Sequence, residues 1–255
     1  MFRHIVYWTS GATLAAMFAF VAGCGGQSQQ PGELLILCGT SFRDPVEKLT
    51  AEYEKQTGQR VELSFGGCED LLPHVQKHVM GDLFVAHDPY MKYTEDNKAL
   101  LRWVEVGRLR PVLVVAKGNP KNIKGLDDLA RPGLQVALPD PNFSTAGKMV
   151  FAMLEEKNIK DAVLKNVGNA QFRAHADIGN QIKLGTCDAG IMWNGVAHNF
   201  ADSVEIVPDP YQYKEQIRVG VIGLSYSKQP EQVEKFLKFA ETEGKKVFAE
   251  YGYVK

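Results

Sequence analysis

Short apolar runs alternate with segments of helical periodicity along this chain, and this alternation constrains its fold more than any other feature. Runs of strand length fall at residues 33–38, 60–65 and 82–87, with helix-forming stretches between them. In the first of these stretches, apolar side chains recur at spacings of four, three and four residues, as on one face of a helix: Phe42, Val46, Leu49 and Tyr53. The resulting β-α-β-α-β order favours a parallel sheet with helices on its faces.

The alternation begins again after a long apolar strand near residues 109–117, and a second long strand follows at 216–225. A chain that crosses out once and returns once forms two lobes joined by two hinge strands. We therefore expect lobe I at residues 33–112 plus 220–255 and lobe II at residues 113–219. The sequence predicts a two-lobed α/β fold with two mainly parallel sheets, helices on both faces of each, and a ligand cleft between the lobes.

The remaining elements follow from the same patterns. In lobe II, strands are expected at 134–138, 188–193 and 204–207, and helices begin at residues 144 and 177. Two further helices are expected at 69–79 and, in the tail, at 229–251.

The first 23 residues have the features of an export signal. Arg3 precedes an apolar run from Ile5 to Val21, which ends in Val-Ala-Gly-Cys at Cys24. The run is short for a membrane span and contains Thr, Ser and Gly, which argues against a transmembrane anchor. Its end resembles a bacterial lipobox, which implies a lipoprotein signal peptide at 1–23, acylation of Cys24 and a tether at 24–32. We thus expect an exported protein of the cell envelope, held at a membrane by its lipid alone and facing the periplasm or exterior.

Charge excludes one class of partner. The chain has 29 basic and 30 acidic residues, a formal charge of −1, and no basic stripe. Nucleic acid is therefore not an expected partner, and an anionic ligand would have to be held by local geometry.

Three predicted strand-to-helix turns, at residues 38–41, 66–68 and 144–147, consist of small or polar residues. Each places backbone N–H groups at a helix N-terminus, where the helix dipole favours negative charge. Ser41, Ser144 and Thr145 could instead be helix caps alone. Because ligands of open parallel sheets lie beyond the carboxyl ends of the strands, we expect the three turns to line one anion site.

Cysteine and histidine offer a second kind of chemistry. Cys38, Cys68 and Cys187 remain after the lipobox, an odd number. Cys38 and Cys68 end neighbouring strands, so a disulfide between them stays an alternative to two free thiols. His74 and His78 lie four residues apart on a helix, a spacing that more often marks a solvated face than a metal site.

The sequence contains no metal-binding or nucleotide-binding motif, including Cys-x-x-Cys, His-Glu-x-x-His and the phosphate-binding loops. A Cys68 nucleophile with His175 as base lacks a third, orienting group. We expect neither a cofactor nor an enzyme.

Several motifs together resemble the molybdate- and tungstate-binding family of solute receptors that serve ABC importers. They are Thr40-Ser41, AEYEKQTGQRVELSFGGCEDL at 51–71, GDLFVAHDPYM at 81–91, STAGK at 144–148, CDAGIMWNG at 187–195 and the closing FAEYGYVK. The resemblance implies a type II periplasmic-binding-protein fold that closes on a tetrahedral oxyanion. It also implies a monomer that delivers the ion to an ABC permease and its ATPase.

The same resemblance assigns the ligand-binding positions to Ser41, Cys68, Ala146, His175 and Trp193. Residues expected at the rim of the cleft are Thr40, Cys38, His87 and Thr145. Four positions depart from the family pattern: Cys68 replaces a serine, Trp193 a tyrosine, His175 an aliphatic residue and His87 a small one. Thiolate and imidazole select soft ligands. The alternative is therefore a thiophilic oxyanion such as arsenite, or a soft transition metal, bound by Cys68 with His87 or His175.

Overall fold

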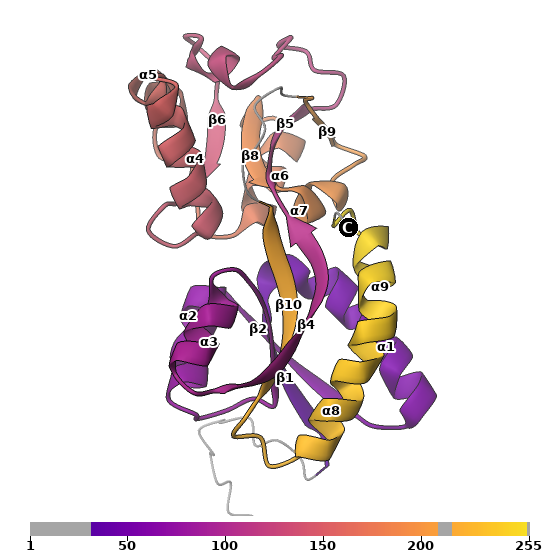
Figure 1. Ribbon diagram of the computed structural model, residues 1–255. Coiled ribbons are helices and arrows are strands. Elements are labelled where there is room, and N and C mark those ends of the chain that lie inside the picture. The colour runs from indigo at the N-terminus through magenta and orange to yellow at the C-terminus, as the bar shows by residue number, and fades with distance from the viewer. Residues whose placement is uncertain (1–31, 209–215, 254–255) are drawn as a thin grey trace, which may run out of the picture.

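The computed structural model describes residues 32–208 and 216–253, which form two lobes, each built on a five-stranded sheet (Figure 1). The first sheet has the order β2-β1-β3-β10-β4. Its strands are β1 (Leu34–Gly39), β2 (Val61–Gly66), β3 (Leu83–His87), β4 (Leu100–Leu109) and β10 (Ile217–Leu224). The second sheet has the order β7-β6-β8-β5-β9. Its strands are β5 (Pro111–Ala116), β6 (Val136–Pro139), β7 (Gln171–Phe172), β8 (Ala189–Trp193) and β9 (Val204–Ile206).

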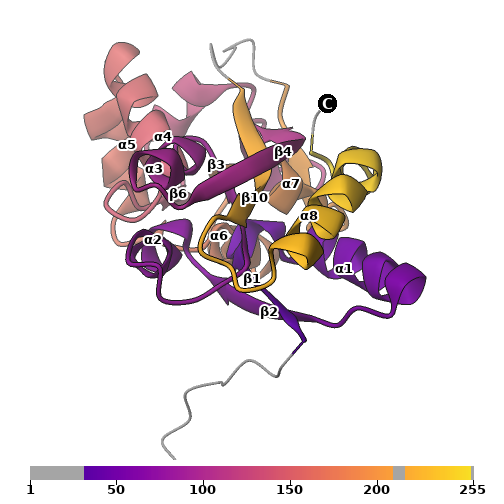
Figure 2. The same cartoon turned by 60° about the horizontal axis from the view of Figure 1, so that its bottom comes forward.

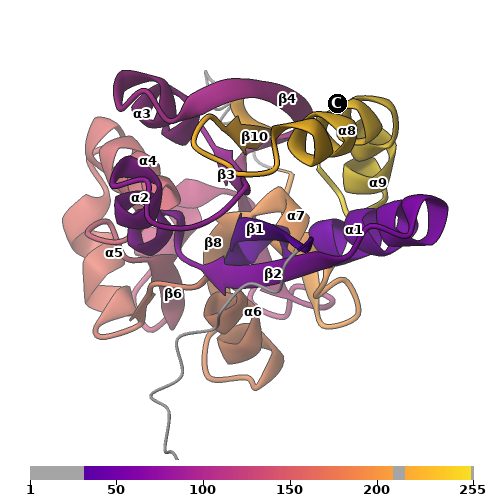
Figure 3. The same cartoon turned by 90° about the horizontal axis from the view of Figure 1, so that it is seen from below.

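Helices cover both faces of the first sheet. One face carries α1 (Arg43–Thr57), α8 (Pro230–Phe239) and α9 (Lys245–Glu250), and the other carries α2 (Cys68–Gln76) and α3 (Tyr90–Asp96) (Figure 3). Helix α1 and the C-terminal helix α9, which is drawn in yellow, therefore lie side by side (Figure 2). Val46, Leu49 and Tyr53 form the buried face of α1, as their spacing predicts.

The second sheet also buries both faces, because alternate residues of its strands point to opposite sides. On one side, Leu113 and Val115 pack in a core with α4 (Thr145–Glu156) and α5 (Lys160–Val167). On the other side, Val114 and Met192 pack with α6 (His175–Lys183) and α7 (Asn194–His198).

The two-lobed α/β fold matches the sequence prediction, but the sheets are mixed rather than mainly parallel. The pairings of β1 with β2 and β3, and of β6 with β7 and β8, are parallel. The pairings made by β10 and β5 are antiparallel, because these strands belong to the segments that pass between the lobes.

Three segments differ from the pattern expected along the chain. The long strand expected at 109–117 is interrupted at Arg110, where β4 of the first sheet ends and β5 of the second begins. Pro111 has no N–H, so it cannot continue the hydrogen bonding of β4. Similarly, β10 pairs with the first sheet from Ile217 onward, although we expected residues 217–219 in lobe II. The single tail helix expected at 229–251 is interrupted by a π-helical turn at Ala240–Gly244.

The expected signal peptide, the acylated Cys24 and most of the tether lie outside the described residues. Within the described part of the chain, no helix combines the length and apolar character needed to cross a membrane.

Asn194 ties the crossing between the lobes to the C-terminal tail. Its side-chain oxygen accepts a hydrogen bond from the Arg110 N–H at 2.9 Å, and its backbone N–H donates to the Arg110 carbonyl at 3.0 Å. Its side-chain amide donates to the Gly252 carbonyl at 2.7 Å. Removing the buried Asn194 side chain would leave the Arg110 N–H and the Gly252 carbonyl without this partner.

We therefore expect Asn194→Ala to lower the free energy of unfolding by about 1–3 kcal/mol, since two partly buried hydrogen bonds are lost. Urea unfolding followed by circular dichroism measures this. The exposed Asn142→Ala serves as the control and should stay within about 0.5 kcal/mol of the unchanged protein. An equally small effect of Asn194→Ala would show that this side chain does not stabilise the crossing.

Candidate ligand-binding site

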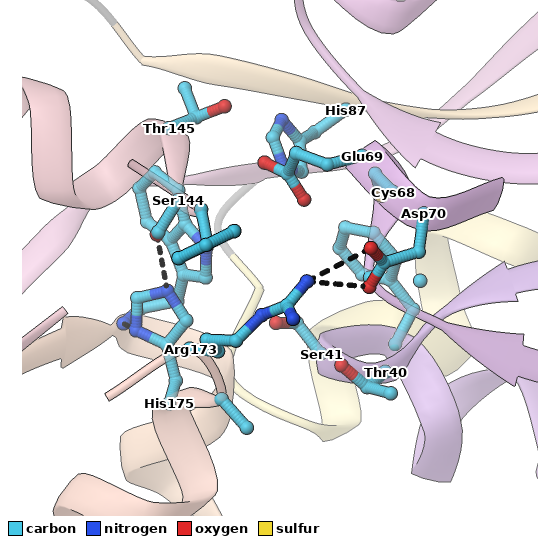
Figure 4. A pocket seen from close by; sticks show the side chains of 16 residues that line it. Thr40, Ser41, Cys68, Glu69, Asp70, His87, Ser144, Thr145, Arg173 and His175 are labelled. Atoms are coloured by element: carbon cyan, nitrogen blue, oxygen red, sulfur yellow. Dashed lines mark hydrogen bonds and ion pairs between the residues drawn. The ribbon is translucent and has the colours of Figure 1, made fainter. Parts of the chain in front are cut away.

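A pocket of about 210 Å³ lies between the lobes. The first lobe contributes residues 39–42 and 67–70 together with His87, and the second contributes 143–145 and 173–175 together with Trp193 (Figure 4). One water molecule takes about 30 Å³ in the liquid. The pocket thus has room for a small ion with a few waters, or for a compact acid.

Four helices begin at this pocket. In the first lobe, β1 leads through a 3₁₀ turn (Thr40–Phe42) into α1, and β2 leads into α2. In the second lobe, β6 precedes α4 and β7 precedes α6. The first turn of each helix has N–H groups without a helical acceptor, and the dipoles add positive potential there. The arrangement suits a negatively charged ligand.

Hydrogen bonds fix the proton of His175. The backbone N–H of Trp193 donates to its Nδ1 at 3.3 Å, so the ring proton of the neutral imidazole is on Nε2. This Nε2 lies 3.3 Å from the Ser144 hydroxyl oxygen, which also accepts from the Gly147 N–H at 3.3 Å as the N-cap of α4. Both acceptor positions of the Ser144 oxygen are thus in use, and the O–H of Ser144 is left to donate. Ser144 lines the pocket, so a ligand there could accept this hydrogen bond.

Aromatic packing joins the two lobes at the pocket. Trp193 stacks on His175 of its own lobe, with centroids 5.4 Å apart, and meets the edge of His87 from the first lobe at 5.7 Å. Burial lowers the pKa of both imidazoles, and that of His175 falls to about 3, with the neighbouring His87 as a second cause. Both rings are therefore neutral at physiological pH.

The cysteines are buried free thiols. Cys38, Cys68 and Cys187 all lack a disulfide, so the alternative of a Cys38–Cys68 bridge does not occur in this structure. Cys68 is the first residue of α2, three positions beyond Phe65, the strand partner of Cys38. Burial, with the nearby Glu69 carboxylate, raises the pKa of Cys68 far above its usual value, so the thiol stays protonated.

Three charged side chains line the pocket as well. Arg173, between β7 and α6, pairs with Asp70 of α2 across the cleft at 2.9 Å and stacks on the Phe143 ring at 4.1 Å. Glu69, beside Asp70, points into the pocket near His87 (Figure 4). Within residues 32–208 and 216–253, no group of three or more His, Cys, Asp or Glu side chains could hold a metal ion.

Residues 34–254 match the model of a family described as bacterial extracellular solute-binding protein. The chain belongs to this family. Binding proteins of ABC importers work with a permease and its ATPase, and they are not enzymes.

Individual relatives agree with this assignment. The solute-binding protein is 25% identical over 238 residues to a putative binding protein of Haemophilus influenzae, covering 89% of this chain and 93% of the relative. It is 22% identical over 215 residues to the molybdate-binding protein ModA of Mycobacterium tuberculosis, covering 79% and 80% of the two chains. Its fold is similar to that of the Azotobacter vinelandii periplasmic molybdate-binding protein, with a TM-score of 0.72 at 18% identity over 87% of this chain and 99% of the other.

Most of the residues that the sequence proposed for the site come together at the pocket. They are Ser41, Cys68, His175 and Trp193, with Thr40, His87 and Thr145 from the expected rim. Ala146 and Cys38, whose side chains are fully buried, do not line it. Ala146 is nevertheless in the first turn of α4, where a backbone N–H rather than a side chain would serve a ligand.

Arg173 and Phe143 also line the pocket, although no sequence pattern indicated them. Both lie in loops without periodicity, and their pairing with α2 depends on the approach of the two lobes. The position of Arg173, just before the start of α6, is the only local signal that could have indicated it.

The neutral His175 makes stability depend on pH. Below pH 6.5 the unfolded chain binds a proton at this imidazole, whereas the folded protein does not until about pH 3. The free energy of unfolding should therefore decrease as the pH falls. His175 alone would account for about 2 kcal/mol between pH 7 and pH 5.

Urea unfolding at the two pH values tests this. We expect the loss in His175→Gln to be smaller than in the unchanged protein by about 2 kcal/mol. The exposed His74→Gln should keep the full loss. An equal pH dependence in all three proteins would contradict a buried neutral His175.

Proposed function

We propose that this solute-binding protein captures a small oxyanion, molybdate or tungstate, between its lobes and delivers it to an ABC permease. The observation that carries the proposal is the convergence of four helix N-termini on one pocket shared by both lobes. A tetrahedral oxyanion accepts hydrogen bonds in several directions, which such a pocket supplies from both sides.

Hydrogen bonds from such a pocket could supply the free energy of micromolar binding. Roughly four to six charge-assisted hydrogen bonds contribute about 1.5–3 kcal/mol each before costs. Association costs at least about 4 kcal/mol. The remainder, about 2–14 kcal/mol, reaches the roughly 8 kcal/mol of micromolar binding when the individual bonds lie near the upper end of their range. A ligand that contacts both lobes stabilises the closed state by its differential affinity, and the permease would recognise closure.

Export and anchoring are parts of the same proposal. The lipobox-like end of the apolar run supports cleavage before Cys24 and lipidation of its thiol. The tether up to residue 32 would then connect the lipid to β1, and the protein would act as a tethered monomer without a cofactor.

We expect Ser144→Ala to weaken molybdate binding about tenfold, because one hydroxyl donor to the ligand is lost. Ser144→Thr keeps both the cap and the O–H and should bind like the unchanged protein. Isothermal titration calorimetry gives the affinities, and thermal unfolding shows whether the cap alone accounts for the change. Unaltered affinity in Ser144→Ala would remove Ser144 from the proposed ligand contacts.

The Cys68→Ser variant separates the oxyanion proposal from the thiophilic alternative. A protonated thiol and a hydroxyl are both neutral donors, so molybdate or tungstate binding should survive the replacement. Native mass spectra of the protein without residues 1–23, recorded with equimolar molybdate, tungstate, arsenite and zinc, measure this. A preference for arsenite or zinc that is lost in Cys68→Ser would contradict the proposal and favour a thiophilic ligand.

A further inference from the structure

We propose that Arg173 is a ligand-binding residue, and that its guanidinium exchanges Asp70 for the oxyanion when the cleft is loaded. This inference rests on the proposed function. It adds a charged contact, from the second lobe, to a site otherwise described through neutral donors.

The position of the guanidinium is the first support. Arg173 extends from the second lobe into the pocket, toward Asp70 on the first lobe (Figure 4). The Phe143 ring covers one face of the guanidinium, with the Arg173 Cζ 4.1 Å from the ring centroid. This stacking restricts the plane of the group.

The donors of Arg173 are only partly used. A single nitrogen, Nη2, makes both contacts with Asp70, at 2.9 Å to Oδ1 and 3.0 Å to Oδ2. Within the described residues, Nε and Nη1 have no hydrogen-bond acceptor. A guanidinium has five N–H groups in a planar fork, which matches two oxygens of one oxyanion. Arg173 could therefore donate to a ligand from Nε and Nη1 while Nη2 still binds Asp70.

The contact with Asp70 is easily replaced. The side chains of Arg173 and Asp70 are 54% and 60% exposed, and ion pairs of this exposure contribute little to stability. Asp70 is on α2, at whose N-terminus the ligand would bind, so its carboxylate occupies the position of an anion. An oxyanion carries the same kind of acceptor oxygens and can take its place on the guanidinium.

The charges of the pocket make this cation necessary for anion binding. Among residues 32–208 and 216–253, Arg173 is the only lysine or arginine that lines the pocket, whereas Glu69 and Asp70 both line it. Among the described residues Glu69 has no cationic partner within ion-pair distance. Without Arg173, a bound anion would meet two carboxylates opposed only by helix dipoles.

Titration calorimetry with sodium molybdate tests the proposal on four variants. Arg173→Gln removes the charge, Arg173→Lys keeps it without the planar fork, and Asp70→Asn removes the competing carboxylate. Arg102→Gln is the matched control, because Arg102 also pairs with a carboxylate, Glu234 at 2.9 Å, but lies on β4 and does not line the pocket. Thermal unfolding of each variant confirms that it is folded.

We expect Arg173→Gln to weaken molybdate binding about 10- to 100-fold, with Arg173→Lys in between and Arg102→Gln unchanged. Asp70→Asn should bind as tightly as the unchanged protein or more tightly. If Arg173 were only a latch between the lobes, Asp70→Asn and Arg173→Gln would weaken binding by the same factor, and that result would overturn the proposal.

Two further outcomes separate this inference from the proposed function. Tight binding of molybdate by the unchanged protein and by Arg173→Gln alike would overturn the role of Arg173 and leave the proposed function intact. Binding of no oxyanion by the unchanged protein would reject the proposed function, and the role of Arg173 with it.

Discussion

The direction in which helices leave the sheets governs the rest of this structure. The parallel strands β1, β2, β6 and β7 end at the cleft, so the helices that follow them start there with their unpaired N–H groups. Two lobes that are built in the same way therefore place the positive ends of four helices around one pocket. Such a pocket selects negative charge by backbone geometry, which explains how a chain with a formal charge of −1 can have a site for an anion.

The segment Trp193–Asn194 connects this pocket to the movement of the lobes. Trp193 contacts His87 of the first lobe and His175 of the second, while Asn194 binds both backbone groups of Arg110 at the crossing. The C-terminal tail adds to the connection: Asn194 donates to Gly252, and the hydroxyl of Tyr253 donates to the Ser41 carbonyl in the first turn of the pocket. A change in the angle between the lobes would thus move the residues that contact the ligand.

The sequence predicted the strands that are continuously apolar and the turns that follow them, because both signals are local. It did not predict β4, because the partly exposed charged residues Arg102, Glu105 and Arg108 interrupt its apolar residues and no apolar run marks it. The π-helical turn at Ala240–Gly244 was also missed, since it keeps the apolar spacing of its neighbours. Within the site, the serine and cysteine turns were found from their small residues. Arg173 was not found, because its partner Asp70 is 103 residues away and meets it only across the cleft. The tautomer of His175 likewise depends on Trp193, which no local pattern reveals.

The most direct test of the central claim is to locate the ion itself. Crystals grown with molybdate and measured at the molybdenum absorption edge would show its position in an anomalous difference map. We expect one strong peak between the lobes, within hydrogen-bond reach of the first turns of α2 and α4 and of the hydroxyls of Ser41 and Ser144. A peak outside this pocket, with the pocket unchanged, would contradict it.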